Sequence, residues 1–237
     1  QNLSILEAKD ILNEAKEFIK LNRSNSKKLD ILRGKTQINL FFEPSTRTQS
    51  SFDLAGKRLG ADVMTMNMDN SALKKGETLI DTAMTLNAMH PDLIVIRHQD
   101  SGACNLLSQK VNCSVINAGD GRREHPTQAL LDLYTIQKEL LDHGSSIDGM
   151  HIAMIGDLKY GRTVHSLSKL LCLFKNVRFT LISPKELPMP TAIIDAIENA
   201  GHQYKITDQF EGIVQMIMHN FDDGMTALDV SNHHGGN

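Results

Sequence analysis

Cysteine is scarce in this 237-residue chain, and its three cysteines, Cys104, Cys113 and Cys172, form no C-x-x-C pair. An odd, scattered set of thiols provides no disulfide framework and is typical of a reducing cytoplasm. Their spacing also argues against a structural zinc site. His233 and His234 are interpreted as part of a solvated tail, so the sequence predicts no bound metal.

Long apolar runs and a surplus of positive charge are lacking as well. No hydrophobic stretch approaches the roughly 20 residues that cross a bilayer, and residues 1–7 lack the basic start and apolar core of a signal peptide. The net charge of −3 provides no overall attraction to nucleic acid or to an anionic membrane. The sequence therefore predicts a cytoplasmic protein with no nucleic-acid or membrane partner.

Nucleotide-binding signatures are absent too. The glycines at 156 and 161 do not form a G-x-G-x-x-G fingerprint, and no Walker pattern occurs in the chain. We therefore expect neither NAD nor FAD, and no cofactor of any kind.

Strand-like and helix-like runs alternate along the chain. Apolar runs at 37–42, 61–66, 92–97 and 114–117 are separated by stretches with helical spacing of apolar residues. The pattern breaks at 142–146 and restarts with runs at 151–155, 179–182 and 203–206. Such alternation predicts an α/β fold with parallel sheets. We expect two doubly wound parallel-sheet domains, 1–141 and 142–237, joined by a helix over 126–141.

A short polar turn lies between the first strand and the helix expected over 48–59. Ser45, Thr46, Arg47 and Thr48 bring three hydroxyls and a guanidinium to a helix start, where backbone N–H groups lack partners. Arg47 can bind an anion through two hydrogen bonds. The alternative is an ordinary N-cap, for which Ser and Thr are the usual residues. The turn alone leaves both interpretations open.

Polar and cationic residues also follow the other strands. Ligands of open α/β sheets bind at the carboxyl ends of the strands, where this chain places Arg97 and His98, then His125 and Gln128, then Arg162. Together they predict a cleft for a small, strongly anionic substrate. His125 opens a helix, which favours a neutral imidazole that polarises a carbonyl. The alternative for His125 is a half-buried structural histidine. Lys75 lies in a polar loop, and without further context it is interpreted as a solvated surface residue.

Six motifs, in order along about residues 1–210, carry a resemblance to a known family. They are Pro44-Ser45-Thr46-Arg47-Thr48, Ser71-Ala72-Leu73-Lys74-Lys75-Gly76-Glu77-Thr78, Val95-Ile96-Arg97-His98, Asn117-Ala118-Gly119-Asp120-Gly121, His125-Pro126-Thr127-Gln128, and the stretch from Gly156 to Ser166. The chain resembles the catalytic chain of aspartate carbamoyltransferase. The sister family, ornithine carbamoyltransferase, shares the first turn and a His-Pro motif but usually lacks the second and sixth motifs.

The resemblance implies transfer of the carbamoyl group of carbamoyl phosphate to L-aspartate. The products are N-carbamoyl-L-aspartate and phosphate, in de novo pyrimidine biosynthesis. It also implies a carbamoyl phosphate-binding first domain, an aspartate-binding second domain, and a homotrimer with shared active sites. Regulatory or pathway-partner chains are compatible with it. A non-catalytic or truncated carbamoyl phosphate-binding relative and the ornithine enzyme are the alternatives.

The resemblance also assigns roles to individual residues. Arg47, Thr48, Arg97 and His125 are expected to be catalytic. The residues expected to bind carbamoyl phosphate are Ser45, Thr46, Arg47, Thr48, Arg97, His125 and Gln128. Arg162 and Lys75 are expected to bind L-aspartate, with Ser71 and Lys75 supplied by the neighbouring subunit.

The last residues depart from the family pattern. The family usually continues into an Arg-x-Gln element for the aspartate carboxylates and a later His-Pro-Leu-Pro-like segment. Residues 215–237 contain no arginine and no proline. We therefore expect the second domain to be incomplete at its C-terminal end.

Overall fold

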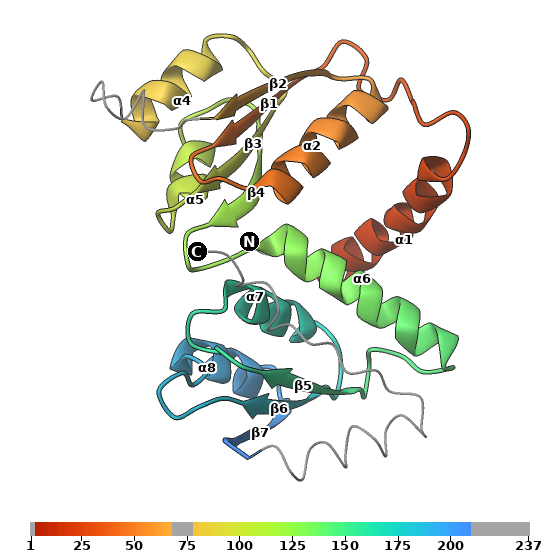
Figure 1. The fold of residues 1–237 in the computed structure, drawn as a ribbon, viewed down its shortest axis with the longest axis vertical. Coiled ribbons are helices and arrows are strands. Elements are labelled where there is room, and N and C mark those ends of the chain that lie inside the picture. The colour runs from red at the N-terminus through yellow and green to blue at the C-terminus, as the bar shows by residue number, and fades with distance from the viewer. Residues whose placement is uncertain (1–2, 68–77, 210–237) are drawn as a thin grey trace. The chain divides into compact units, whose positions relative to one another are not determined.

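A computed structural model describes residues 3–67 and 78–209, and it alternates helices and strands along the chain (Figure 1). The helices are α1 (Ile5–Asn22), α2 (Thr46–Leu59), α4 (Leu79–Asn87), α5 (Ala103–Ser108), α6 (Pro126–Asp142), α7 (Arg162–Leu171) and α8 (Thr191–Asn199). The strands are β1 (Thr36–Phe41), β2 (Asp62–Asn67), β3 (Leu93–His98), β4 (Ser114–Asp120), β5 (His151–Ile155), β6 (Arg178–Ile182) and β7 (Gln203–Thr207). The expected α/β fold with two parallel sheets is confirmed.

The chain divides into two compact units, and the division differs from the one expected. One unit is Glu14–His125, and the other combines Gln1–Asn13 with Pro126–Asn237. The sequence places helix 126–141 at the end of the first domain. In the structure, Leu133 and Leu140 of α6 belong to the core that contains the second sheet. Helical periodicity shows that α6 has an apolar face, but it does not show which sheet covers that face.

The sheet of the unit Glu14–His125 is parallel, with strand order β2-β1-β3-β4. Alternate residues of its strands face opposite sides, because strand side chains repeat with a period of two. Ile38, Leu40 and Ile96 point to the side covered by α4 and α5, where they pack in one apolar cluster. This side is a conventional hydrophobic core.

The opposite side of β1 packs against α2 through hydrogen bonds. Gln37 Nε2 donates to Asn39 Oδ1 at 2.8 Å and to the carbonyl of Phe52 at 3.0 Å. Asn39 Nδ2 donates to Thr65 Oγ1 at 3.0 Å, which donates to Asp53 Oδ1 at 3.1 Å. These directional contacts, which we call the polar seam, attach α2 to two strands. They therefore set the orientation of the helix whose first turn carries Arg47.

Gly56 allows α2 to approach the polar seam closely. It is the buried residue of α2, and a Cβ at this position would lie 2.5 Å from Gln37 Oε1 and 2.7 Å from Val63 Cγ2. Any larger residue would push the helix away from the strands. Glycine therefore permits the close approach of the helix backbone to the strands.

Replacing Asn39 by leucine is expected to lower the free energy of unfolding by about 2 kcal/mol, because the buried Gln37 and the half-buried Thr65 each lose a hydrogen-bond partner. Chemical denaturation measures the change. Lys57→Ala is the control on the same helix, since its ion pair with Asp53 is partly exposed and contributes under about 1 kcal/mol. Equal losses for the two variants would show that the polar seam does not hold α2.

Among the described residues, the sheet of the second unit is parallel with the strand order β5-β6-β7. Its core joins residues of this sheet, such as Met154 and Leu181, to α6, α7, α8 and the first turns of α1, where Ala8 and Leu12 are buried. Arg162 begins α7 directly after the loop that follows β5. The unit therefore places Arg162 near the carboxyl edge of its own sheet.

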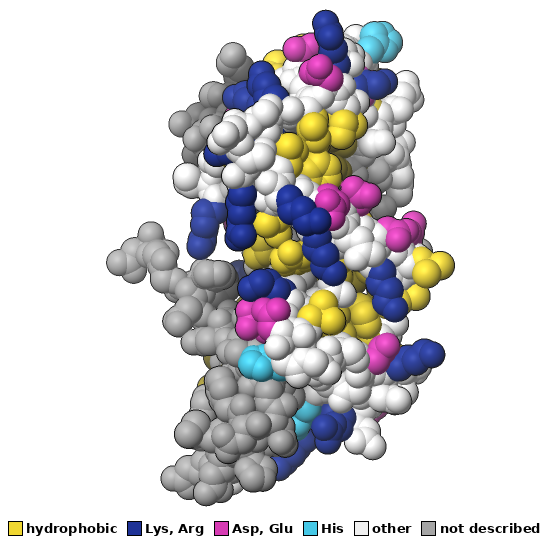
Figure 2. Space-filling view, turned by 90° about the vertical axis from the view of Figure 1, so that its right-hand side faces the viewer, with side chains coloured by type: hydrophobic (Ala, Val, Ile, Leu, Met, Phe, Trp, Pro, Cys, Tyr) yellow, Lys and Arg dark blue, Asp and Glu magenta, His cyan; other side chains and the backbone are white. Residues whose placement is uncertain are grey.

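Charged side chains of both signs lie among small hydrophobic patches on the face drawn in Figure 2. Among the described residues, no helix is both long enough and apolar enough to cross a membrane.

Candidate functional site

The strand order of the first sheet reverses between β1 and β3. The chain runs from β1 outward to β2 and then crosses to β3 on the other side of β1. Phe41 pairs with Arg97, and the N–H of Phe42 donates to the carbonyl of Arg97 at 2.9 Å. The carboxyl end at such a reversal is where open α/β sheets bind ligands. The turn 45–48 follows β1, and Arg97 is the second-last residue of β3, so both flank this point.

Ser45 precedes the first turn of α2, yet it does not cap the helix through its side chain. Its backbone has φ −160° and ψ 85°, and its hydroxyl makes no capping hydrogen bond. The first turn contains no acidic residue. The N–H groups of Thr46, Arg47 and Thr48 have no partner within the helix, because the first such bond, from Gln49 N–H, goes back to Ser45. The structure therefore shows no side-chain cap at Ser45, and anion binding by this turn stays a prediction.

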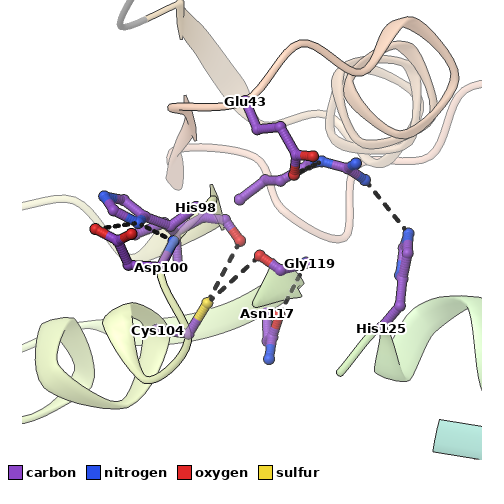
Figure 3. Close-up of polar contacts among 9 residues, drawn as sticks. Glu43, His98, Asp100, Cys104, Asn117, Gly119 and His125 are labelled. Atoms are coloured by element: carbon purple, nitrogen blue, oxygen red, sulfur yellow. Dashed lines mark hydrogen bonds and ion pairs between the residues drawn. The ribbon is translucent and has the colours of Figure 1, made fainter. Parts of the chain in front are cut away.

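Arg97 is buried at the end of β3, with 7% of its surface exposed. Its Nε donates to Glu43 Oε2 at 3.0 Å, and its Nη1 lies 3.5 Å from His125 Nε2 (Figure 3). The His125 ring is also buried. A guanidinium only donates, so a hydrogen bond in this pair requires an imidazole with no proton on Nε2. Glu43, Arg97 and His125 come from three separate segments and meet at one edge of the sheet.

Gly119 makes room for the Arg97 side chain. Its φ is +140°, and a Cβ at this position would lie 3.2 Å from Arg97 Cγ and 3.4 Å from Arg97 Nη1. The sequence motif 118–121 suggests a glycine-rich turn, but β4 continues through Asp120. The strand extends further than expected because Asp120 still pairs with His98 after a register shift.

The His98 side chain does not lie beside the Arg97 side chain. Adjacent strand residues face opposite sides of a sheet, and the His98 ring packs against Phe42, with ring centroids 4.6 Å apart. Its Nδ1 accepts a hydrogen bond from the N–H of Asp100 at 2.9 Å, and burial lowers the pKa of its imidazole. Figure 3 shows this ring on the side away from His125. His98 is therefore a neutral, packed residue near neutral pH.

Gln128 and Arg162 belong to the other unit. Gln128 lies in the first turn of α6, where its Nε2 donates to Asp132 Oδ1 at 2.7 Å, and Arg162 is the first residue of α7. Their roles toward the group around Arg97 stay predictions. Ser71 and Lys75 lie outside the described residues.

Covalent catalysis by a thiol finds no support in this structure. Burial, with a further contribution from Asp120, raises the pKa of the Cys104 thiol to about 12, and burial raises that of Cys172 to about 11. Both thiols stay protonated at neutral pH and are poor nucleophiles. Within residues 3–67 and 78–209, no group of His, Cys, Asp and Glu side chains could hold a metal ion. The arrangement is suited to binding an anion and to polarising an oxygen by hydrogen bonding.

Glu43 is the residue of this group that sequence reasoning missed. It lies just beyond β1, after Phe42, so the sequence indicates its position at the carboxyl edge, but its partner lies 54 residues away. A carboxylate between the end of β1 and the polar turn 45–48 is the signal that could have identified it. Its charge offsets that of the buried guanidinium, which would otherwise be costly to bury.

The chain is similar to proteins of one known family. A family model described as aspartate/ornithine carbamoyltransferase, carbamoyl-P binding domain, matches residues 1–138. The aspartate carbamoyltransferase catalytic subunit of Pelagibacter ubique is 65% identical over 193 residues, which are 81% of this chain and 60% of that protein. This chain therefore spans about 60% of the length of that curated relative.

Solved structures show the same likeness. The catalytic subunit of M. jannaschii aspartate transcarbamoylase is 44% identical with a TM-score of 0.79, covering 89% of this chain and 67% of that one. A Trypanosoma cruzi aspartate transcarbamoylase in complex with carbamoyl phosphate and aspartate is 38% identical with a TM-score of 0.78, covering 87% of this chain and 64% of that one. Since the family model alone matches more than half of the residues, the chain belongs to the aspartate/ornithine carbamoyltransferase family.

Proposed function

We propose that this chain binds carbamoyl phosphate and transfers its carbamoyl group to the amine of L-aspartate. The products would be N-carbamoyl-L-aspartate and phosphate, for de novo pyrimidine biosynthesis. The observation that carries the proposal is the buried Arg97, held by Glu43 beside His125, at the strand-order reversal that Ser45–Thr48 also flanks. The names of the similar proteins, and the carbamoyl phosphate and aspartate in the Trypanosoma cruzi complex, support the choice of substrates.

The phosphate half of the substrate would bind at the first turn of α2. The hydroxyls of Ser45, Thr46 and Thr48, the backbone N–H groups and the exposed Arg47 guanidinium supply donors at the positive end of a helix dipole. These donors stabilise the phosphate both when it binds and when it leaves. A cation at this point also reduces the repulsion between two anionic substrates.

The carbamoyl half would bind toward Arg97 and His125. Attack by the amine forms a C–N bond and places negative charge on the carbonyl oxygen before the C–O bond to phosphate breaks. Donors that are already oriented toward that oxygen stabilise the charge without reorganisation. The low exposure of Arg97 reduces screening by water and so strengthens this effect. Thr48 and Gln128 would add further hydrogen bonds to the same half.

The aspartate half would depend on Arg162 and on Lys75, with Ser71 and Lys75 supplied by the neighbouring subunit of a homotrimer. Arg162 offers a planar fork that matches a carboxylate. No cofactor and no metal take part in the proposed reaction. Binding of both substrates in one orientation accounts for several kcal/mol of the barrier.

A colorimetric assay for carbamoyl aspartate tests the function. Carbamoyl phosphate with aspartate should give product, whereas carbamoyl phosphate with ornithine should give no citrulline. A folded oligomer that forms no product would refute the proposed activity and would favour a non-catalytic protein that binds carbamoyl phosphate. Product with ornithine alone would assign the sister activity.

Shared sites between subunits lead to a further expected result. Lys75→Ala and Arg47→Ala chains should each be nearly inactive, because each lacks one part of every site. After subunit exchange, a mixture should regain part of the activity, since some sites combine an intact Arg47 with an intact Lys75 from the next chain. Mixing without exchange is the control. No recovery after exchange would show that each site is built from one chain.

A further inference from the structure

Asp120 is a carboxylate with no exposed surface, at the end of β4. Its Oδ1 accepts a hydrogen bond from the N–H of Gly102 at 2.8 Å. Its backbone N–H donates to the carbonyl of Glu124 at 3.0 Å, and its own carbonyl accepts from the N–H of Arg123 at 3.0 Å. One residue therefore contacts two loops, 99–102 and 121–124.

These two loops lead to the two donors of the candidate site. The loop 99–102 follows the end of β3, which carries Arg97, and the loop 121–124 precedes His125. The N–H of Gly121 donates to the carbonyl of His98 at 2.9 Å. Gly121 has φ +55°, and a Cβ on it would lie 2.6 Å from Ser101 Oγ and 2.7 Å from the carbonyl oxygen of Gln99. The loops therefore touch, and Asp120 bonds to both.

The second carboxylate oxygen of Asp120, Oδ2, forms no hydrogen bond to either loop. Oδ2 is buried, and no described group forms a well-aligned hydrogen bond to it. The Cys104 thiol lies beside the carboxylate, but a protonated thiol is only a weak donor. A buried oxygen without a strong partner is costly. The contribution of Asp120 is thus concentrated in Oδ1 and the backbone.

We propose that Asp120 is a positioning residue for carbamoyl transfer. It acts by fixing the loops on either side of it, so that the Arg97 guanidinium and the His125 imidazole stay within 3.5 Å of each other. Asp120 itself touches no substrate. The inference rests on the proposed function, because the relative position of the Arg97 guanidinium and the His125 imidazole matters for polarising one carbonyl oxygen.

Three variants test the proposal. Asp120→Ala removes the acceptor for the Gly102 N–H, and Asp120→Asn keeps that acceptor, Oδ1. Leu107→Ala is the control for stability, because it removes a buried leucine of the same unit that lies in neither loop. Asp120→Ala should lower kcat by ~100-fold, because a small misplacement of catalytic donors has effects of that size. KM for carbamoyl phosphate should change little, and Asp120→Asn should restore most of kcat. Leu107→Ala should lower the melting temperature at least as much, with far less loss of kcat.

Hydrogen exchange at the Arg97 Nε–H, followed by NMR, gives a readout that needs no activity. This N–H bonds to Glu43, and its exchange should be faster in Asp120→Ala than in Leu107→Ala. Equal exchange and equal kcat in these two variants would overturn the proposal, as would an Asp120→Asn variant as inactive as Asp120→Ala. An unsubstituted chain that neither binds carbamoyl phosphate nor forms product would overturn the proposed function and this inference together. Wild-type behaviour of Asp120→Ala in an active chain would overturn only this inference.

Discussion

Replacing Arg47 by alanine is expected to lower kcat/KM for carbamoyl phosphate by ~10³-fold. The phosphate group then loses a cationic guanidinium that can donate two hydrogen bonds to it, both when the substrate binds and when phosphate leaves. Arg47 is exposed in the first turn of α2, so the free energy of unfolding should stay within about 0.5 kcal/mol of the unsubstituted value. Steady-state kinetics and chemical denaturation measure the two quantities.

Two further variants make this result specific. Arg47→Lys keeps the charge but not the planar fork, and we expect it to recover only part of the loss. Arg23→Ala removes another exposed arginine, outside the proposed site, and should leave kinetics unchanged. A near-wild-type kcat/KM for Arg47→Ala would show that the turn 45–48 does not bind the phosphate.

Replacing His125 by alanine is expected to lower kcat by about 10²–10³-fold, the usual cost of removing a donor to a developing oxyanion. KM for carbamoyl phosphate should rise much less, because the imidazole acts mainly in the transition state and the phosphate keeps its own donors. The ion pair of Arg97 with Glu43 does not involve His125 and should persist. Stopped-time product assays over a range of carbamoyl phosphate concentrations separate the two parameters.

His143→Ala is the matched control, since this histidine is exposed just after the end of α6. His125→Gln retains a side-chain N–H donor and should keep more activity than His125→Ala. A kcat for His125→Ala within threefold of the unsubstituted protein would return His125 to the alternative that the sequence left open, a buried structural histidine.

The fold followed closely from sequence patterns, because each element depends on local information. The apolar run 92–97 and the strand β3 differ by one residue at each end, and Gly60, with φ +90°, ends α2 where expected. The sequence patterns do not predict to which of the two units α6 belongs. Leu133 and Leu140 show that α6 has an apolar face, but their packing partners lie in a sheet formed later in the chain.

The sequence predicts Arg97 and His125 at this edge of the sheet but not the contacts that hold them, and their roles toward a substrate stay predictions. Arg97 and His125 were identified because they follow strands, and the structure brings them together. Glu43 and Asp120 were missed because their partners are distant in sequence or are backbone groups, which leave no periodic signal. His98 was grouped with Arg97, although strand alternation alone predicts that adjacent residues face opposite sides.

The central claim is that the turn after β1 and the Arg97–His125 pair together form a carbamoyl phosphate site. Isothermal titration calorimetry of the unsubstituted chain with freshly dissolved carbamoyl phosphate, beside Arg47→Ala and Arg23→Ala, tests it most directly. We expect saturable binding that is retained in Arg23→Ala, lost in Arg47→Ala, and competed by inorganic phosphate. Binding of equal affinity in all three proteins, or no binding by the unsubstituted chain, would contradict it.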